Sequence, residues 1–210
     1  MTESYKEVNA RYYEQELARW GNDVHALWGN TESQQERFQV LSELGDFSGK
    51  SVLDVGCGFG DFYDFLRGKG IHFHYLGIDL SEKMIVIAKQ KFPEASFEVR
   101  DILSKPLPDA SFDFVVASGI FPLKIPRWME TTGHILSAMY KTCRIGTGVN
   151  FLSTFTIGKK FPGRYYANPA IVVDFACKNL SPRIVLRHDY RPNDFTLHIY
   201  KPFKQKGNSK

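Results

Sequence analysis

Apolar residues recur every three or four positions from residue 5 to 45, a spacing that places them on one face of a helix. Few helix-breaking residues interrupt this part of the chain, apart from GNDVHALWGN at 21–30, whose Gly-Asn pairs favour turns. The pattern therefore predicts two helices separated by this segment. Thr31 and Gln34, three residues apart, resemble a capping box at the start of the second helix.

Beyond residue 50 the spacing changes, and short apolar runs alternate with longer amphipathic stretches. Runs bounded by turn-forming residues predict strands at 51–56, 74–80, 96–102, 112–119 and 148–156. The stretches between and after them predict helices at 60–70, 82–92, 126–143 and 168–180. Ser81 is expected to cap the second of these helices, and Gly68 or Gly70 to end the first. Alternating strands and helices favour a mostly parallel sheet with helices on both faces.

The last third of the chain ends in two further apolar runs, PRIVLRHDY at 182–190 and DFTLHIYK at 194–201. Only the tripeptide RPN separates them, which is too short for the crossover that parallel strands need. The two runs must therefore form an antiparallel hairpin. We expect one α/β domain over residues 46–203, preceded by a helical segment at 1–45.

Composition narrows the class of protein. The 210 residues carry a net charge of +4, and part of the excess lies in the basic tail at 204–210, which is expected to be disordered. Arg and Lys form no compact block interleaved with aromatic residues, so nucleic-acid binding is not expected. The cysteines Cys57, Cys143 and Cys177 form no CxxC pair, which favours reduced thiols over disulfides or a metal site. A polar N-terminus and the lack of a long apolar run predict a cytoplasmic protein with no membrane partner.

The stretch VLDVGCGFGDF at 52–62 places Gly56, Gly58 and Gly60 directly after a predicted strand. Glycines in such a turn let the backbone approach a ligand and expose the N–H groups of the following helix. The dinucleotide fingerprint needs a further glycine where this chain has Asp61, and a carboxylate there would repel a pyrophosphate. The Gly-Lys-Ser/Thr of a P-loop is also missing from the turn. The stretch therefore argues against a dinucleotide.

Three aspartates follow consecutive predicted strands. Asp54 lies within the first strand, Asp79 ends the second and lies 19 residues beyond Gly60, and Asp101 ends the third. Each alone fits a helix cap or a turn, but three at one edge of a sheet indicate a shared ligand site. A ligand matched to them has an amine, a ribose diol and an adenine amino group, and is cationic. S-adenosylmethionine (SAM) meets this description.

These motifs, with LGIDLS, FEVRDI and FDFVVASGIF, resemble in order and spacing the successive motifs of class I SAM-dependent methyltransferases. The resemblance covers about residues 50–157 and the C-terminal hairpin. It implies a Rossmann-like, mostly parallel sheet of seven strands with an antiparallel last strand, helices on both faces and a helical lid over residues 1–45. It also implies an enzyme that uses SAM and releases S-adenosylhomocysteine.

The residues implied to contact SAM lie at the ends of the predicted strands: Asp54, Gly56, Cys57, Gly58, Asp79, Leu80, Asp101, Ile102, Ser118 and Gly119. Asp54 would hold the methionine amine, Asp79 the ribose hydroxyls and Asp101 the adenine edge. Phe59 stands where the family commonly has a small or hydroxyl residue, and should narrow the mouth of the pocket.

The acceptor side carries weaker signals. After the fourth predicted strand the chain has SGIFPLKIP, not the Asn-Pro-Pro-aromatic motif of many enzymes that methylate base or amide nitrogens. This favours a small-molecule acceptor. Near a sulfonium an aromatic ring is favourable, and an arginine could pair with the methionine carboxylate. Tyr12 or Tyr13, Trp28 and Arg37 are therefore candidate lid and cofactor contacts, with packing on the sheet edge as the alternative.

His188 and Tyr13 are the candidate catalytic residues. His188 beside Asp189 could act as a general base, because histidine titrates near neutrality. Neighbours on a strand point to opposite faces, however, which favours a structural or surface histidine. The segment FPGRYYANP at 161–169, with Arg164, could cover an anionic or aromatic acceptor or form an ordinary surface loop.

The sequence thus predicts a methyltransferase that transfers the methyl group of SAM to oxygen or nitrogen of a small molecule, as a monomer or homodimer. Two alternatives stay open at this point. One is a tRNA or protein methyltransferase, and the other is a non-catalytic regulatory protein that binds SAM or a nucleoside.

Overall fold

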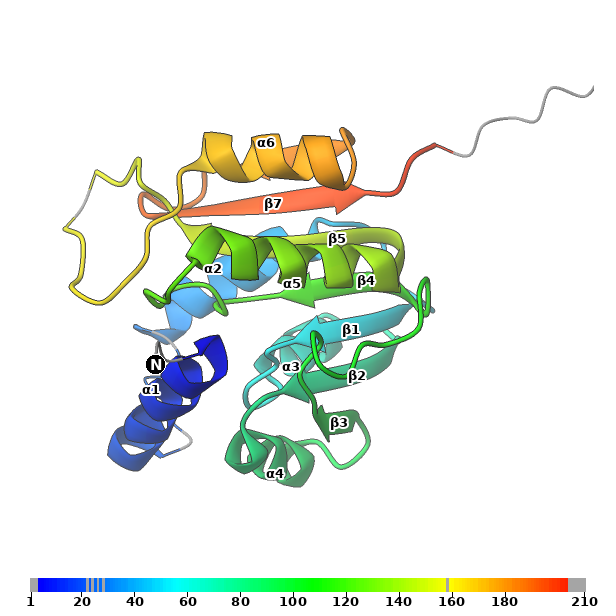
Figure 1. Cartoon of the computed structure of the whole chain (residues 1–210). Coiled ribbons are helices and arrows are strands. Elements are labelled where there is room, and N and C mark those ends of the chain that lie inside the picture. Colours follow the sequence, from blue (N-terminus) through cyan, green and yellow to red (C-terminus); the bar gives the residue numbers. More distant parts are fainter. Residues whose placement is uncertain are drawn as a thin grey trace, which may run out of the picture.

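A seven-stranded sheet in the order β3-β2-β1-β4-β5-β7-β6 forms the centre of the molecule (Figure 1). The computed structural model describes residues 4–21, 23, 25, 27, 29–157 and 159–203. The strands are β1 (Ser51–Val55), β2 (His74–Asp79), β3 (Ser96–Val99), β4 (Phe112–Ala117), β5 (Cys143–Leu152), β6 (Ile184–Arg187) and β7 (Asp194–Tyr200). The first five strands pair in parallel, and β7 is antiparallel to both β5 and β6. The predicted fold class and the C-terminal hairpin are confirmed.

Helices cover both faces of the sheet. They are α1 (Tyr5–Trp20), α2 (Thr31–Ser42), α3 (Asp61–Gly68), α4 (Glu82–Lys91), α5 (Trp128–Thr142) and α6 (Pro169–Asn179). Leu136 of α5 and Val172 of α6 belong to the core cluster on one face, and Leu41 of α2, Leu66 of α3 and Ile85 of α4 belong to the cluster on the other. Strand order reverses between β1 and β4, so the carboxyl ends of these strands form the edge at which such sheets bind ligands.

The two N-terminal helices differ in how they are held. None of the residues of α1, all of which the structure describes, is buried, and the helix lies beside the carboxyl ends of the strands (Figure 1). By contrast, α2 contributes Phe38 and Leu41 to the core and packs against α3, β5 and β7. A movable lid within residues 1–45 stays a prediction, and α1 is the part whose position suits it.

Several element ends differ from the sequence-based prediction. The side chain of Asn30 caps α2 by accepting from the backbone N–H of Ser33, so the cap lies one residue before the expected Thr31. Strand β5 begins at Cys143, directly after α5 and five residues before the predicted start. Gly146 and Gly148 lie in this part of the strand, and their role is packing. A Cβ on Gly148 would lie 3.2 Å from Leu41 Cδ2, so the missing side chains let α2 lie close on the strand.

No helix among the described residues is long and apolar enough to cross a membrane. The basic tail expected at 204–210 lies outside the described residues.

Candidate functional site

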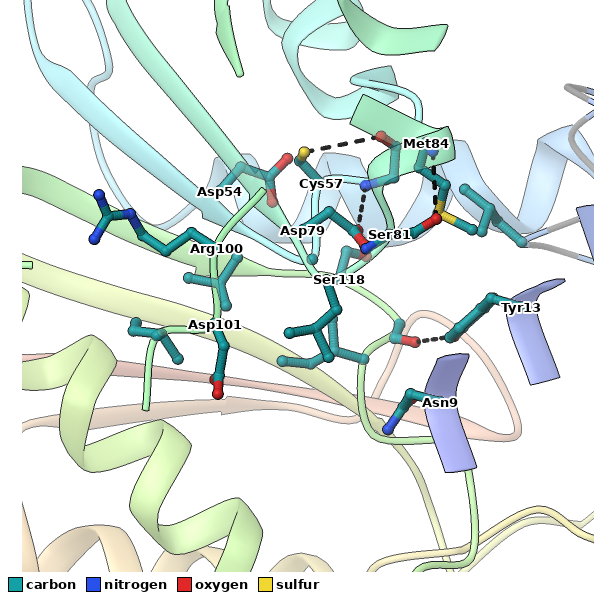
Figure 2. A pocket seen from close by; sticks show the side chains of 18 of the residues that line it. Asn9, Tyr13, Asp54, Cys57, Asp79, Ser81, Met84, Arg100, Asp101 and Ser118 are labelled. Atoms are coloured by element: carbon teal, nitrogen blue, oxygen red, sulfur yellow. Dashed lines mark hydrogen bonds between the residues drawn. The ribbon is translucent and has the colours of Figure 1, made fainter. Parts of the chain in front are cut away.

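A cavity of about 380 Å³ opens at the carboxyl ends of β1, β2 and β4 (Figure 2). One wall comes from α1, whose lining residues are Tyr5, Asn9, Ala10, Tyr13 and Glu14. Acidic side chains outnumber basic ones in the lining of the cavity. The carboxylates are Glu14, Asp54, Asp61, Asp79, Glu82 and Asp101, and the cations are Lys83 and Arg100. The cavity therefore favours a ligand that carries positive charge.

The glycine turn between β1 and α3 forms the floor of this cavity. Gly56 and Gly58 have φ angles of +73° and +53°, the left-handed region that favours glycine. A Cβ on Gly56 would lie 2.2 Å from Ile120 Cγ2, and one on Gly58 would lie 2.6 Å from Leu27 Cδ1. The turn is held down by two hydrogen bonds, of 2.7 Å and 3.1 Å, from the N–H groups of Gly56 and Cys57 to the carbonyl of Ile78. Neither glycine can be replaced without moving the backbone or its neighbours.

Asp79 ties the glycine turn to the start of α4. Its two carboxylate oxygens accept the backbone N–H groups of Gly58, at 3.0 Å, and of Ser81, at 2.9 Å. Burial raises the pKa of Asp79, and the backbone N–H groups of Ser81, Gly58 and Leu80 partly offset this effect. Carboxylate oxygens retain lone pairs after such bonds, so Asp79 can still accept a hydrogen bond from a bound ligand.

Asp54 is a buried carboxyl group at the end of β1. It is 3% exposed, and the Tyr75 hydroxyl donates to its Oδ2 at 2.8 Å. Burial raises the pKa of Asp54 to about 7, although the Tyr75 hydrogen bond acts in the opposite direction and the charges of Asp79 and Asp61 add to the rise. A cation bound beside it would favour the ionised form.

Asp101 carries the contact between α1 and the cavity. The Tyr5 hydroxyl donates to its Oδ1 at 2.6 Å, and Lys6 Nζ lies 2.5 Å from its Oδ2. The Leu103 backbone N–H donates to Oδ1 at 2.9 Å. Burial alone would raise the pKa of Asp101, but these donors outweigh it and lower the pKa to about 2. Sequence reasoning missed Tyr5 and Lys6, which are separated from Asp101 by more than 90 residues.

The loop after β4 is fixed from two sides. Buried Asn150 of β5 accepts the Gly119 backbone N–H at 2.8 Å and donates to Ser118 Oγ at 2.7 Å. From the opposite side the Tyr13 hydroxyl of α1 donates to the Gly119 carbonyl at 3.2 Å (Figure 2). Asn150 was also missed, because an asparagine inside a strand gives no local signal of its distant partners.

Comparison with known proteins bears on this geometry. Residues 52–146 match the family of methyltransferase domains. A curated relative from Mycobacterium tuberculosis, assigned as methyltransferase Rv1506c, is 30% identical over 156 residues, which cover 72% of this chain and 93% of the relative. The chain belongs to the class I SAM-dependent methyltransferases.

Solved structures share the fold of this methyltransferase. The [4+2]-cyclase SpnF aligns with a TM-score of 0.70 at 16% identity, covering 96% of this chain and 97% of that one. A SAM-dependent methyltransferase from Aquifex aeolicus aligns with a TM-score of 0.63 at 17% identity, covering 90% of this chain and 97% of that one. Other curated methyltransferases that the chain matches are longer, and it spans less than half of their length.

The methyltransferase uses SAM, and the cavity suits that cofactor. The excess of carboxylates fits a sulfonium and an amine, and the two glycines leave the floor without side chains. The cavity lining includes these residues predicted to contact SAM: Asp54, Gly56, Cys57, Gly58, Asp79, Leu80, Asp101, Ile102, Ser118 and Gly119. Their individual contacts to the cofactor stay predictions. Within the described residues no group of His, Cys, Asp or Glu is arranged to hold a metal ion.

Other predicted residues lie elsewhere. Arg37 forms a bidentate ion pair with buried Asp194, at 3.0 Å and 2.9 Å, and does not line the cavity. The phenol of Tyr12 accepts from the Arg164 guanidinium, whose carbon lies 4.7 Å from the centre of the Tyr12 ring. Trp28 lies outside the described residues. Of the N-terminal candidates that the structure describes, Tyr13 lines the cavity, and Tyr12 and Arg37 do not.

His188 is also outside the cavity lining. Its ring lies 6.3 Å from that of Phe155 and 6.1 Å from that of Phe195, while Asp189 pairs with Arg187 at 2.8 Å. The arrangement fits the structural role that strand geometry favoured for His188.

Phe59 does not narrow the pocket mouth as expected. It is 1% exposed and forms a small cluster with Met84, on which Tyr13 and Leu17 of α1 pack. The bulky side chain thus supports α1 from beneath.

Proposed function

We propose that this methyltransferase acts on a small-molecule acceptor and transfers the methyl group of SAM to an oxygen or nitrogen atom. The observation that carries the proposal is the acidic cavity beneath α1. Its volume of about 380 Å³ lies within the range of small-molecule sites. When bound, SAM supplies an electrophilic methyl group on a sulfonium. The protein's task is then to align the acceptor with it and to exclude water.

In the proposed arrangement each aspartate of the rim binds one part of the cofactor. Asp54 holds the amine, because its buried carboxyl group gains most from a cationic neighbour. Asp79 accepts from the ribose hydroxyls through lone pairs left free by Gly58 and Ser81. Asp101 accepts from the adenine amino group, in the position where Tyr5 and Lys6 now contact it.

Helix α1 acts as the lid in this proposal. It has no buried residue, and its polar ties to the body are those of Tyr5 and Lys6 to Asp101, of Tyr13 to Gly119 and of Tyr12 to Arg164. Its apolar contacts at this edge include the packing of Tyr13 and Leu17 on the small cluster of Phe59 and Met84. Such contacts have low net free energy and can open without disturbing the core. Opening of α1 admits the ligands, and closure shields the reaction.

Tyr13 is assigned a positioning role instead of that of a general base. Burial raises the pKa of its phenol above the usual value, so the hydroxyl stays protonated at neutral pH and the phenolate that a general base would need is disfavoured. Its donation to Gly119 holds the loop that borders the proposed methionine site. For His188 we propose no catalytic role.

The test combines cofactor binding with a search for the acceptor. Titration calorimetry should show that Asp79→Ala loses most SAM affinity, while Asp174→Asn, on the outer helix α6, binds like the parent protein. Unchanged affinity in Asp79→Ala would show that the cofactor placement is wrong. Incubation with methyl-labelled SAM and fractionated cell extract should place the label in the small-molecule pool. Label in RNA or protein would support the macromolecular alternative, and SAM binding without any transfer would support the regulatory one.

A further inference from the structure

The segment between β5 and α6 presents large apolar side chains to solvent. Phe155, Ile157 and Phe161 are 58%, 91% and 60% exposed, and the other large apolar side chains of the described residues that are more than half exposed, Ile171 and Phe203, lie outside this segment. Three such side chains within seven residues are unusual on a monomer surface and mark an interaction site. In Figure 1 the segment, drawn in yellow, projects beyond the sheet on the side where α1 lies.

The same segment is basic. Lys159 and Lys160 stand between the apolar residues, and both are exposed. Between Asp113 and Asp174 the sequence contains a single acidic residue, Glu130, which pairs with Arg127 at 2.6 Å. The electrostatic character of this surface is therefore opposite to that of the acidic cavity beside it.

The segment has a defined position on the body of the protein. The Tyr165 N–H donates to the Pro122 carbonyl at 2.8 Å, and the Lys124 N–H donates to the Gly163 carbonyl at 3.1 Å. These bonds join it to the loop that follows β4, which also carries Ser118 and Gly119 of the cavity. Lys124 is exposed and thereby joins the basic surface. We call Phe155, Ile157, Phe161, Lys124, Lys159 and Lys160 the loop patch.

We propose that the loop patch docks the methyltransferase on an anionic membrane surface, with the apolar side chains entering the interface and the lysines contacting headgroups. An apolar group flanked by cations matches both the chemistry and the charge of such a surface. In Figure 1 the segment projects from the body of the protein, as insertion into a lipid interface requires. Its cations are lysines, which protein–protein interfaces disfavour relative to arginine.

The docking needs no membrane-spanning helix, because a surface loop lies on the bilayer instead of crossing it. The patch adjoins the cavity through the β4 loop and through Arg164, which contacts Tyr12 of α1. Docking therefore brings the lid and the cavity entrance close to the lipid surface. This inference is independent of the proposed acceptor atom.

The test measures sedimentation of the full chain with vesicles of phosphatidylcholine, with and without phosphatidylglycerol. We expect binding only to the anionic vesicles, and release of the protein at high salt. Lys159→Gln with Lys160→Gln should weaken binding about 25-fold, since each lysine contributes about fivefold at such a surface. Ile157→Ser with Phe161→Ser should also weaken it, because less apolar surface enters the interface.

Two control pairs match these changes on other faces of the protein. Lys89→Gln with Lys141→Gln removes the same charge, and Val86→Ser with Val185→Ser removes exposed apolar groups from α4 and β6. Both controls should bind vesicles like the parent chain, and all variants should keep its SAM affinity, which shows that the fold and cofactor site are intact. No binding of the parent chain to anionic vesicles, or equal losses in patch and control pairs, would overturn the proposal.

Discussion

Asp54→Asn should make the ligand-free protein more stable and the cofactor site weaker, because Asp54 is a buried carboxyl group with a pKa of about 7. In the unfolded chain this group ionises near its ordinary pKa of 3.8. The folded state therefore holds an extra proton between these values, and stability falls as pH rises from 3.8 to 7. Above that window the cost is about 4 kcal/mol, from 1.36 kcal/mol per pKa unit.

The asparagine removes this cost while keeping an oxygen that can accept from the Tyr75 hydroxyl. Urea unfolding of ligand-free protein at pH 8 should therefore show Asp54→Asn more stable by up to about 4 kcal/mol, and the difference should vanish near pH 4. If the variant is less stable than the parent at pH 8, ionisation of the buried Asp54 carboxyl group does not destabilise the folded protein.

The same substitution, which stabilises the ligand-free protein, should weaken its affinity for SAM. If the amine of SAM requires the ionised form of Asp54, the apparent affinity follows the ionised fraction, which rises from about 0.03 at pH 5.5 to about 0.5 at pH 7. The parent protein should thus bind about sixteenfold more tightly at pH 7 than at pH 5.5, and Asp54→Asn should lose this dependence. Calorimetry in buffers of different ionisation enthalpy should detect about half a proton released at pH 7. Equal pH profiles for the two proteins would refute the assignment.

Three further predictions concern the imidazole of His198, the hydrogen bond of Tyr5 and the backbone of Gly56. Burial lowers the pKa of His198 to about 4, so unfolded protein binds more protons between pH 4 and 6.5 and stability is lost as pH falls through that window. Between pH 7 and pH 5 the free energy of unfolding in urea should fall by about 2 kcal/mol more for the parent than for His198→Asn. If the two proteins show the same pH dependence, His198 is not the group responsible. Tyr5→Phe removes a hydrogen bond to the Asp101 carboxylate and should speed hydrogen exchange along α1 about tenfold without affecting β1, which exchange mass spectrometry can read. Gly56→Ala should destabilise the fold by about 1–3 kcal/mol in thermal unfolding, because its Cβ would collide with Ile120, whereas Gly49→Ala changes backbone strain alone.

The strand-end part of the site was predictable because its signals are local. Glycines in a strand-to-helix turn and aspartates at successive strand ends are specified within a few residues, and parallel pairing of β1, β2 and β3 then brings Asp54, Asp79 and Asp101 to one edge. The order of the elements was predictable for the same reason. Their ends were less predictable, because a strand expected to begin at Gly148 begins at Cys143 in the folded chain.

Contacts between distant segments were not predictable. Arg37 looked free to bind a carboxylate, but Asp194, 157 positions later, pairs with it in the folded chain. Asn150 and Tyr5 gave no signal because their partners are set by tertiary packing alone. A sequence search for membrane association looks for long apolar runs, so it passes over three separate apolar residues that the fold exposes together.

The contact between Tyr5 and Asp101 has a consequence for the order of events. In the proposed assignment one carboxylate serves the lid in the free enzyme and adenine in the loaded enzyme, so loading is an exchange of partners with nearly balanced numbers of hydrogen bonds. The enthalpy of loading should be correspondingly small at this subsite. The start of α1 then changes partners with every turnover, which makes its N-terminus a reporter of cofactor occupancy. In the same assignment, a purification tag fused at the N-terminal end would lie next to the start of α1 and would hinder this exchange of partners.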